Sequence, residues 1–97
     1  MQETIQKAIK YILYVNHILF ASKYFNWGGA FEARCMLQEV YETLHNASNE
    51  LLEKAAKCAF EADYQLLRAL HFESDAYPLI RKCLSDAYKS LKQLESN

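Results

Sequence analysis

The residues whose types and spacing come closest to a metal site are Glu39, Glu42 and His45. They are three apart, so on a helix they would step along one side and could offer carboxylate oxygens and an imidazole nitrogen to one ion. A metal-binding bundle also needs carboxylates from facing helices, and the segment 3–25 contributes only Glu3. Because Glu39 and Glu42 lie opposite the main apolar stripe of their segment, we expect them to face solvent and to bind no metal.

Nucleophilic catalysis would need a histidine placed beside a serine or cysteine nucleophile. The sequence has three histidines, His17, His45 and His71, and none of them lies in a local signature with such a nucleophile. A glycine-rich loop that could cradle nucleotide phosphates is also missing, since the sequence has two glycines in all. We therefore predict that the protein is not an enzyme and that it has no catalytic residues, no cofactor and no bound metal.

The composition is typical of a globular domain and differs from that of a nucleic-acid-binding protein. The chain has 97 residues, of which 52% are hydrophobic and 24% charged, so it can form a core. Its net charge is −1 and its pI is near 6.3, whereas nucleic-acid-binding domains often have a pI above about 9. The sequence has no run of about 18 apolar residues. We expect no nucleic-acid partner and no membrane span.

The N-terminal residues and the cysteines indicate a compartment. Residues 1–4 lack a basic segment leading into an apolar one, so no secretory signal is expected. The three cysteines, Cys35, Cys58 and Cys83, are odd in number, far apart and placed in helical patterns. This pattern favours reduced thiols that pack as small apolar groups in a cytoplasmic protein.

The elements that must position these residues are predicted by apolar spacing and by a scarcity of helix breakers. The two glycines, Gly28 and Gly29, are adjacent, and Pro78 is the other strong break. Elsewhere apolar residues recur at the spacing of amphipathic helices. We predict a single all-α domain over 1–97, a small helical bundle of three to four antiparallel helices. The expected helices are 3–25, 30–46, 49–71 and 76–95.

The boundary in the middle of the chain has two interpretations. The stretch 30–71 keeps one apolar phase and could form a single long central helix of about 40 residues, near 60 Å at 1.5 Å per residue. The other interpretation places a break in Asn46-Ala47-Ser48-Asn49, where poor helix formers cluster and could cap a new helix. Because helices of globular proteins average about 11–12 residues, the break is favoured.

Apolar residues outside the main core stripes predict a contact surface. One group forms a second stripe on the first helix, and another lies on the far side of the stretch 30–71. The predicted partner-binding residues are Tyr11, Tyr14, Ile18, Phe25, Trp27, Phe31, Phe60 and Tyr64. Aromatic residues are enriched where interfaces form, so we expect a protein partner, with a homodimer through the stripe on the first helix. The alternative is that a four-helix bundle buries both stripes inside the monomer.

Residues 17–44 resemble one tetratricopeptide repeat. The matching residues are Phe20, Ala21, Tyr24, Gly28, Ala33, Leu37 and Val40. In that family pattern, small residues such as Ala21 and Ala33 stand where two helices touch, and a glycine forms the turn between them. The resemblance implies a TPR-like helical hairpin, and we expect Gly28 to turn the chain with a positive φ.

These features together favour a non-catalytic helical protein–protein interaction module. We expect an adaptor, regulator or chaperone-like subunit that self-associates. The alternative is a ferritin-like, carboxylate-rich metal-binding helical bundle, because the Glu-x-x-His spacing of Glu42 and His45 is similar to the ligand spacing of that family. Metal analysis of protein purified without chelator separates the two.

Overall fold

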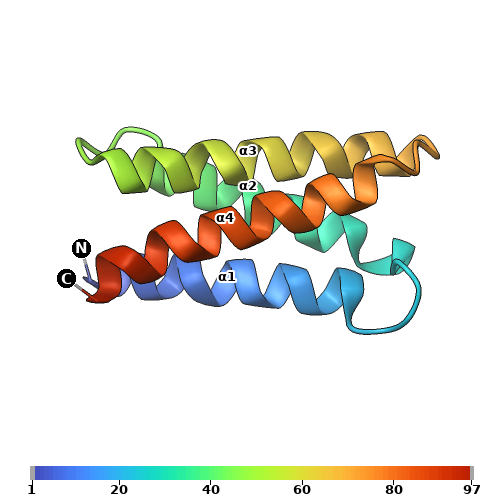
Figure 1. Cartoon of the computed structure of the whole chain (residues 1–97), viewed down its shortest axis with the longest axis horizontal. Coiled ribbons are helices and arrows are strands. Elements are labelled where there is room, and N and C mark those ends of the chain that lie inside the picture. The colour runs from blue at the N-terminus through green and yellow to red at the C-terminus, as the bar shows by residue number, and fades with distance from the viewer. Residues whose placement is uncertain (1, 97) are drawn as a thin grey trace.

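The computed structural model describes residues 2–96, and these form four helices and one short 3-10 turn. The elements are α1 (Gln2–Phe20), η1 (Trp27–Gly29), α2 (Ala30–Leu44), α3 (Glu50–Leu70) and α4 (Ala76–Ser96). The described residues contain no strand. Successive helices run in opposite directions, and the start of α1 lies at the same end of the molecule as the end of α4 (Figure 1). The predicted all-α bundle and the predicted break inside 30–71 are both confirmed.

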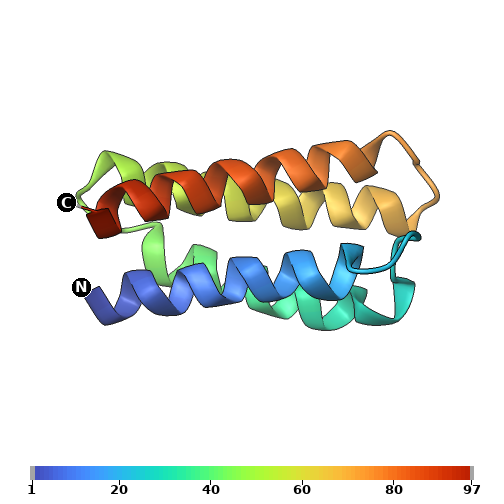
Figure 2. The same cartoon turned by 60° about the horizontal axis from the view of Figure 1, so that its bottom comes forward.

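The four helices close into a ring around one core. Each helix packs against the next one in the chain, and α1 also packs against α4. Figure 2 shows α1 and α2 together on one side and α3 and α4 together on the other. The molecule measures 38 × 21 × 19 Å along its principal axes, so the helices lie along its length. The two short ends of the bundle therefore carry all the connections.

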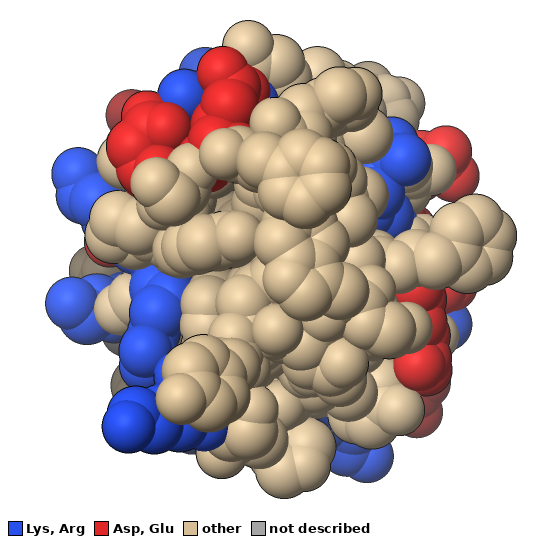
Figure 3. All heavy atoms as spheres, turned by 90° about the vertical axis from the view of Figure 1, so that its right-hand side faces the viewer, with Lys and Arg blue, Asp and Glu red and all other residues tan. Residues whose placement is uncertain are grey.

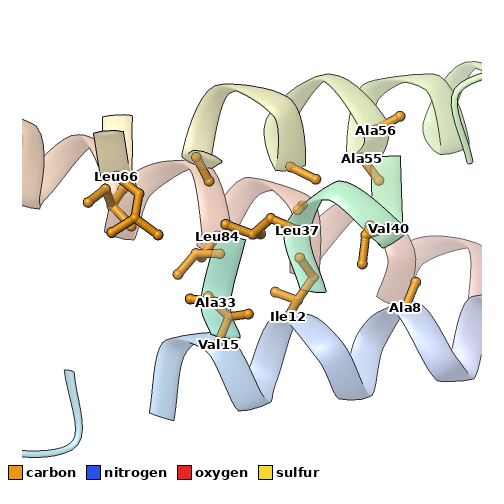
Figure 4. Packing of buried hydrophobic residues seen from close by; sticks show 14 of the residues in the cluster. Ala8, Ile12, Val15, Ala33, Leu37, Val40, Ala55, Ala56, Leu66 and Leu84 are labelled. Atoms are coloured by element: carbon orange, nitrogen blue, oxygen red, sulfur yellow. The ribbon is translucent and has the colours of Figure 1, made fainter. Parts of the chain in front are cut away.

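The core combines small residues on α3 with larger ones on the other helices. The buried alanines of α3 are Ala55, Ala56, Ala59, Ala62 and Ala69. A methyl side chain lets neighbouring helices approach α3 closely, and the space is filled by branched side chains such as Ile12, Leu37 and Leu84 (Figure 4). Burying one such large side chain stabilises the fold by about 1.5–3 kcal/mol.

Helix α1 ends five residues before its predicted end at residue 25, and that boundary was wrong. The hydroxyl of Ser22 binds the backbone of Tyr24, donating to its carbonyl at 2.7 Å and accepting from its N–H at 3.3 Å. Such local bonds compete with the helical ladder. The side chain of Asn26 then donates to the carbonyl of Ile18 at 2.9 Å, which satisfies a carbonyl that helix continuation would have used.

The connection between α2 and α3 is closed by a side-chain cap. The carboxamide oxygen of Asn49 accepts from the N–H groups of Leu51 at 2.9 Å and Leu52 at 3.2 Å. Asparagine is among the preferred N-cap residues because it satisfies N–H groups that have no partner within the helix. The cluster of poor helix formers predicted this break, and Asn49 is the member that caps α3.

Candidate functional site

Five aromatic residues gather at the end of the bundle where α1 is joined to α2 and α3 to α4. We call this surface the aromatic end, and it consists of Phe20, Phe25, Trp27, Phe72 and Tyr77. Figure 3 views the molecule from this end and shows an uncharged centre with charged side chains around it. The residues come from the last turn of α1, both connections and the first turn of α4, so the fold brings together four separate segments.

Phe25 is the centre of this cluster. Its ring stacks on that of Tyr77 with 4.9 Å between centroids, and it meets the edges of Phe20 at 5.7 Å and Trp27 at 5.0 Å. Aromatic pairs in such geometries contribute about 0.5–1.5 kcal/mol each beyond the area they bury. Phe25 is half-buried against the core, whereas Trp27 keeps 41% of its surface exposed. The cluster therefore has a packed base and an exposed upper layer.

The connection between α1 and α2 is held by the side chain of Asn26. Its amide nitrogen donates to the carbonyl of Ile18 at 2.9 Å, and its oxygen accepts from the N–H of Gly28 at 3.1 Å. Neither glycine has a positive φ, so the expected role of Gly28 was wrong. A Cβ atom on Gly29 would lie 3.3 Å from the carbonyl oxygen of Ile18. Glycine is needed here for close approach of two backbones.

The connection between α3 and α4 does contain a left-handed residue, and it is Phe72, with φ of 64°. The N–H of Phe72 donates to the carbonyl of Ala69 at 3.0 Å, and the N–H of Glu73 donates to that of Arg68 at 3.1 Å. These two bonds define a Schellman motif with Phe72 at the position that is usually glycine. The phenyl ring is 84% exposed and touches Trp27, with 5.7 Å between ring centroids.

Acidic groups border the aromatic end on the side of the α3–α4 connection. Arg68 donates to Glu73 at 3.2 Å, to Asp75 at 2.8 Å and to the side-chain oxygen of Gln65 at 2.8 Å. The hydrogen bond from the Arg68 guanidinium holds the pKa of Asp75 below its ordinary value of 3.8. One arginine faces two carboxylates, so this border carries a net negative charge.

Basic groups border the aromatic end on the side of α1 and α4. The guanidinium of Arg81 lies 5.0 Å from the centroid of the Phe20 ring, and the ammonium of Lys23 lies 5.8 Å from that of Tyr24. Both are cation–π distances. A shallow groove of about 560 Å³ runs between His17 and Gly28, and the residues that line it include no Asp or Glu. The two borders of this end therefore differ in sign.

The predicted residues of the first helix lie along the seam between α1 and α2. Tyr11 and Ile18 are half-buried and pack against the core, while Tyr14 is exposed. The carboxylate of Glu32 on α2 raises the pKa of the Tyr14 phenol. Phe25 does not belong to this stripe because α1 ends at Phe20. The predicted stripe is thus divided between a helix seam and the aromatic end.

The other predicted residues are exposed but separate. Trp27 belongs to the aromatic end, whereas Phe31, Phe60 and Tyr64 lie on α2 and α3 with much of their surface in solvent. Phe60 contacts Tyr41 with 5.2 Å between ring centroids. Among the described residues, no ring contact joins Phe31, Phe60 and Tyr64 to one another. Phe60 and Tyr64 are four residues apart on α3 and so lie on the same side of that helix.

Three residues of the aromatic end, Phe20, Phe72 and Tyr77, were missing from the predicted set. Phe20 is half-buried against the core. Phe72 lies between the predicted helices 49–71 and 76–95, whereas Tyr77 lies in the first turn of the second of these. The available signal for Phe72 was an aromatic residue directly after the end of a predicted helix, followed by Glu73, Ser74 and Asp75.

The candidate metal ligands are engaged with their own surroundings. Glu39 pairs with Lys7 at 3.3 Å. The Nδ1 atom of His45 lies 3.1 Å from the backbone carbonyls of both Tyr41 and Glu42, and its ring stacks on Tyr41. Within residues 2–96, no group of three or more His, Cys, Asp or Glu side chains is arranged to hold a metal ion. This surface is a solvated helix face.

The three cysteines have different surroundings, and all are free thiols. Cys35 is exposed, so the expectation that it packs as an apolar group was wrong, because it lies on the outer face of α2. Cys58 and Cys83 are half-buried. Burial raises the pKa of the Cys58 thiol and raises that of Cys83 to about 11. Both groups are protonated at neutral pH and are therefore poor nucleophiles.

When the chain is compared with known proteins, no protein family, no curated protein and no solved structure matches it. Within the described part of the chain, no helix is long and apolar enough to span a bilayer. The aromatic end, its two charged borders and the left-handed turn at Phe72 are the features from which a function is proposed below.

Proposed function

We propose that the protein is a non-catalytic helical protein–protein interaction module, an adaptor, regulator or chaperone-like subunit, and that the aromatic end is its contact surface. The observation that carries this proposal is Phe72. It combines a left-handed backbone with a φ of 64° and an 84% exposed phenyl ring.

Phe72 is unfavourable for the isolated fold in two respects. A side chain in the left-handed region costs about 1–2 kcal/mol relative to a conformation with negative φ, and glycine avoids that cost. The exposed phenyl ring also recovers little hydrophobic energy, since its one aromatic contact is with Trp27. Residues that break a local rule without a gain in packing are typical of functional positions. A partner that covers the ring would supply the missing gain.

The surroundings of Phe72 are suited to binding. Trp27 lies beside it and contacts Phe25 and Tyr77, so the Trp27 ring is held in place before any partner arrives. Tryptophan is among the residues that dominate binding energy in interfaces. Because a preorganised surface loses little side-chain entropy on binding, a small number of such rings is enough for specific contact.

The surroundings of the histidines and of the half-buried cysteines, the groups most often used in catalysis, favour a non-catalytic role. All three histidines are exposed, and the Nδ1 atoms of His45 and His71 lie within 3.1 Å of backbone carbonyls of their own helices. Among the described residues, no hydrogen bond joins a histidine ring to a serine, threonine or cysteine side chain, as an activated nucleophile would require. The half-buried thiols of Cys58 and Cys83 are protonated for the reason given above.

The proposal is tested by capture from an extract of the native host, with the protein immobilised and bound proteins identified by mass spectrometry. Phe72→Gly removes the exposed ring and suits the left-handed backbone, so it should keep the fold and lose the specifically bound proteins. Phe60→Ser is the matched control, because it removes a 58% exposed phenyl ring from the middle of α3. Retention of the same proteins by wild type and Phe72→Gly, or their loss only in Phe60→Ser, would contradict the proposed surface.

A further inference from the structure

The partner of the aromatic end can be argued from the charges that border it, an argument that rests on the proposed function. We infer that this surface docks on the aromatic end of a second copy of the same chain, so that two bundles meet end to end about a two-fold axis. Three observations carry the inference: the uncharged centre of the surface, the opposite signs of its two borders and the position of the termini.

The two borders are complementary to each other. Figure 3 shows acidic side chains grouped at the upper left of this end and basic side chains at its lower left. The α3–α4 connection brings Glu73 and Asp75 to the acidic side, and the basic side includes Lys23 and Arg81. A two-fold axis that lies in the plane of this end, between the two groups, would place each acidic group on the basic group of the other copy.

A two-fold interface requires a surface that is complementary to itself, because the same patch is used by both partners. A border of a single sign would repel its own copy and would favour a partner of the opposite charge. Here the positive and negative borders flank one apolar centre, and Phe72 and Trp27 of one copy would cover the same rings of the other. The mixed charge therefore favours a second copy over a uniformly acidic or basic partner.

The first turn of α1 and the last turn of α4 lie at the opposite end of the bundle (Figure 1), so neither of these turns covers the aromatic end. The size of this end predicts how tight the contact is. A cross-section of 21 × 19 Å is about 400 Å², below the roughly 800 Å² that each partner buries in an interface of standard size. We expect weak association, with a dimer dissociation constant on the order of 100 µM.

The shape of the dimer distinguishes this inference from pairing along the side of α1. A bundle 38 Å long that pairs end to end gives a particle of about twice that length. Side-by-side pairing would leave the length nearly unchanged. Sedimentation equilibrium from tens of micromolar to about one millimolar, with small-angle scattering at the upper concentration, measures both mass and length.

Three variants test the contacts. Phe72→Gly should weaken dimerisation at least about tenfold while helicity is retained. Lys23→Glu places like charges opposite each other twice in the dimer, as does Asp75→Lys, so each variant alone should be monomeric at low salt. Mixing the two should restore a dimer, because in a mixed pair each contact between position 23 of one copy and position 75 of the other again joins opposite charges. Circular dichroism checks that each variant is folded.

The outcomes separate the two proposals. An elongated dimer that Phe72→Gly weakens and that the mixture of charge variants restores supports the second copy as partner. A wild-type monomer at every concentration overturns the inference, as does a dimer of unchanged length or one that is indifferent to Phe72→Gly. If host proteins are still captured through Phe72 while the wild type stays monomeric, the inference fails and the proposed function stands.

Discussion

The two connections at the aromatic end both reverse the direction of the chain between antiparallel helices, but they do so with different residue types. The α1–α2 connection contains both glycines of the chain, yet neither has a positive φ. The α3–α4 connection contains no glycine, yet its residue Phe72 has a φ of 64°. In the first connection the residue types suit the structure, and in the second they do not. The second connection therefore keeps a backbone conformation that its own residue type does not favour.

The largest expected effect concerns the amide that holds the first connection. Asn26→Ala removes two side-chain hydrogen bonds, to the carbonyl of Ile18 and from the N–H of Gly28. We expect a loss of about 2 kcal/mol and a lower Tm by roughly 8–16 °C, since 1 kcal/mol corresponds to about 4–8 °C in a domain of this size. Asn46→Ala, in the α2–α3 connection, is the control and should change Tm little. A thermal melt in which the two variants behave alike would contradict this role for Asn26.

The next effect separates the two adjacent glycines. A Cβ atom on Gly29 would lie 3.3 Å from both the backbone oxygen of Ile18 and the Asn26 amide nitrogen, whereas a Cβ atom on Gly28 would meet only the Asn26 amide oxygen at 3.3 Å. The Asn26 amide can shift by a few tenths of an ångström and keep its hydrogen bonds more easily than a helix carbonyl can. We therefore expect Gly29→Ala to destabilise by about 1 kcal/mol and Gly28→Ala to be nearly neutral, because the lower entropy of the unfolded chain offsets the contact. Urea unfolding of both variants measures the difference, and equal losses would argue against close approach at Gly29.

These two connections also mark where sequence reasoning succeeded and where it failed. Apolar periodicity predicted four helices. It also placed Phe25 among the contact residues, although as part of a stripe on the first helix, which ends at Phe20. The sequence did not indicate whether a glycine is needed for a positive φ or for close packing against another segment, since that depends on how closely Ile18 approaches. It also did not place the end of α1, because the amide of Asn26 reaches back eight residues.

Phe72 was missed for a different physical reason. Its left-handed backbone is imposed by the bonds that close α3, from the N–H groups of Phe72 and Glu73 to carbonyls of the last turn. Glycine usually signals such a turn in a sequence, and here the signal is missing because phenylalanine takes its place. A pattern method that searches for favourable residues cannot detect a position at which the residue is unfavourable. The left-handed backbone of Phe72 was therefore recognisable only from the structure.

The smaller stability effect at Phe72 has the opposite sign. Phe72→Gly should stabilise the protein by about 1 kcal/mol, raising Tm by roughly 4–8 °C. Phe72→Ala keeps the left-handed strain and loses the contact with Trp27, so it should be neutral or slightly destabilising. The difference in free energy of unfolding between the two variants, measured in denaturant, gives the cost of the left-handed backbone conformation. If glycine and alanine destabilise equally, the ring is a structural part of the fold, and the reason to regard it as a binding residue is lost.

The smallest expected effect is a pH dependence that belongs to the second connection alone. Arg68 lowers the pKa of Asp75 through a hydrogen bond, so the folded state holds this proton less tightly than the unfolded state. The contribution of the Asp75 charge to the stability of the folded state is therefore present above the ordinary pKa of 3.8 and is lost as pH falls through and below that value. Because Asp75 is largely exposed, the stabilisation is small.

Thermal melts of wild type and Asp75→Asn at about pH 6 and about pH 3 measure the stabilising contribution of the Asp75 charge. The difference in Tm between the two proteins at each pH cancels the effect of the other carboxylates. The wild type should melt higher than Asp75→Asn at the upper pH, and the gap should narrow at the lower one. Gly28→Ala is the control from the first connection, and its difference from wild type should be the same at both pH values. A gap that is as large at the lower pH as at the upper one would mean that the Asp75 side chain supports the turn without its charge. The ion pair would then no longer distinguish the α3–α4 connection from the amide-held α1–α2 connection.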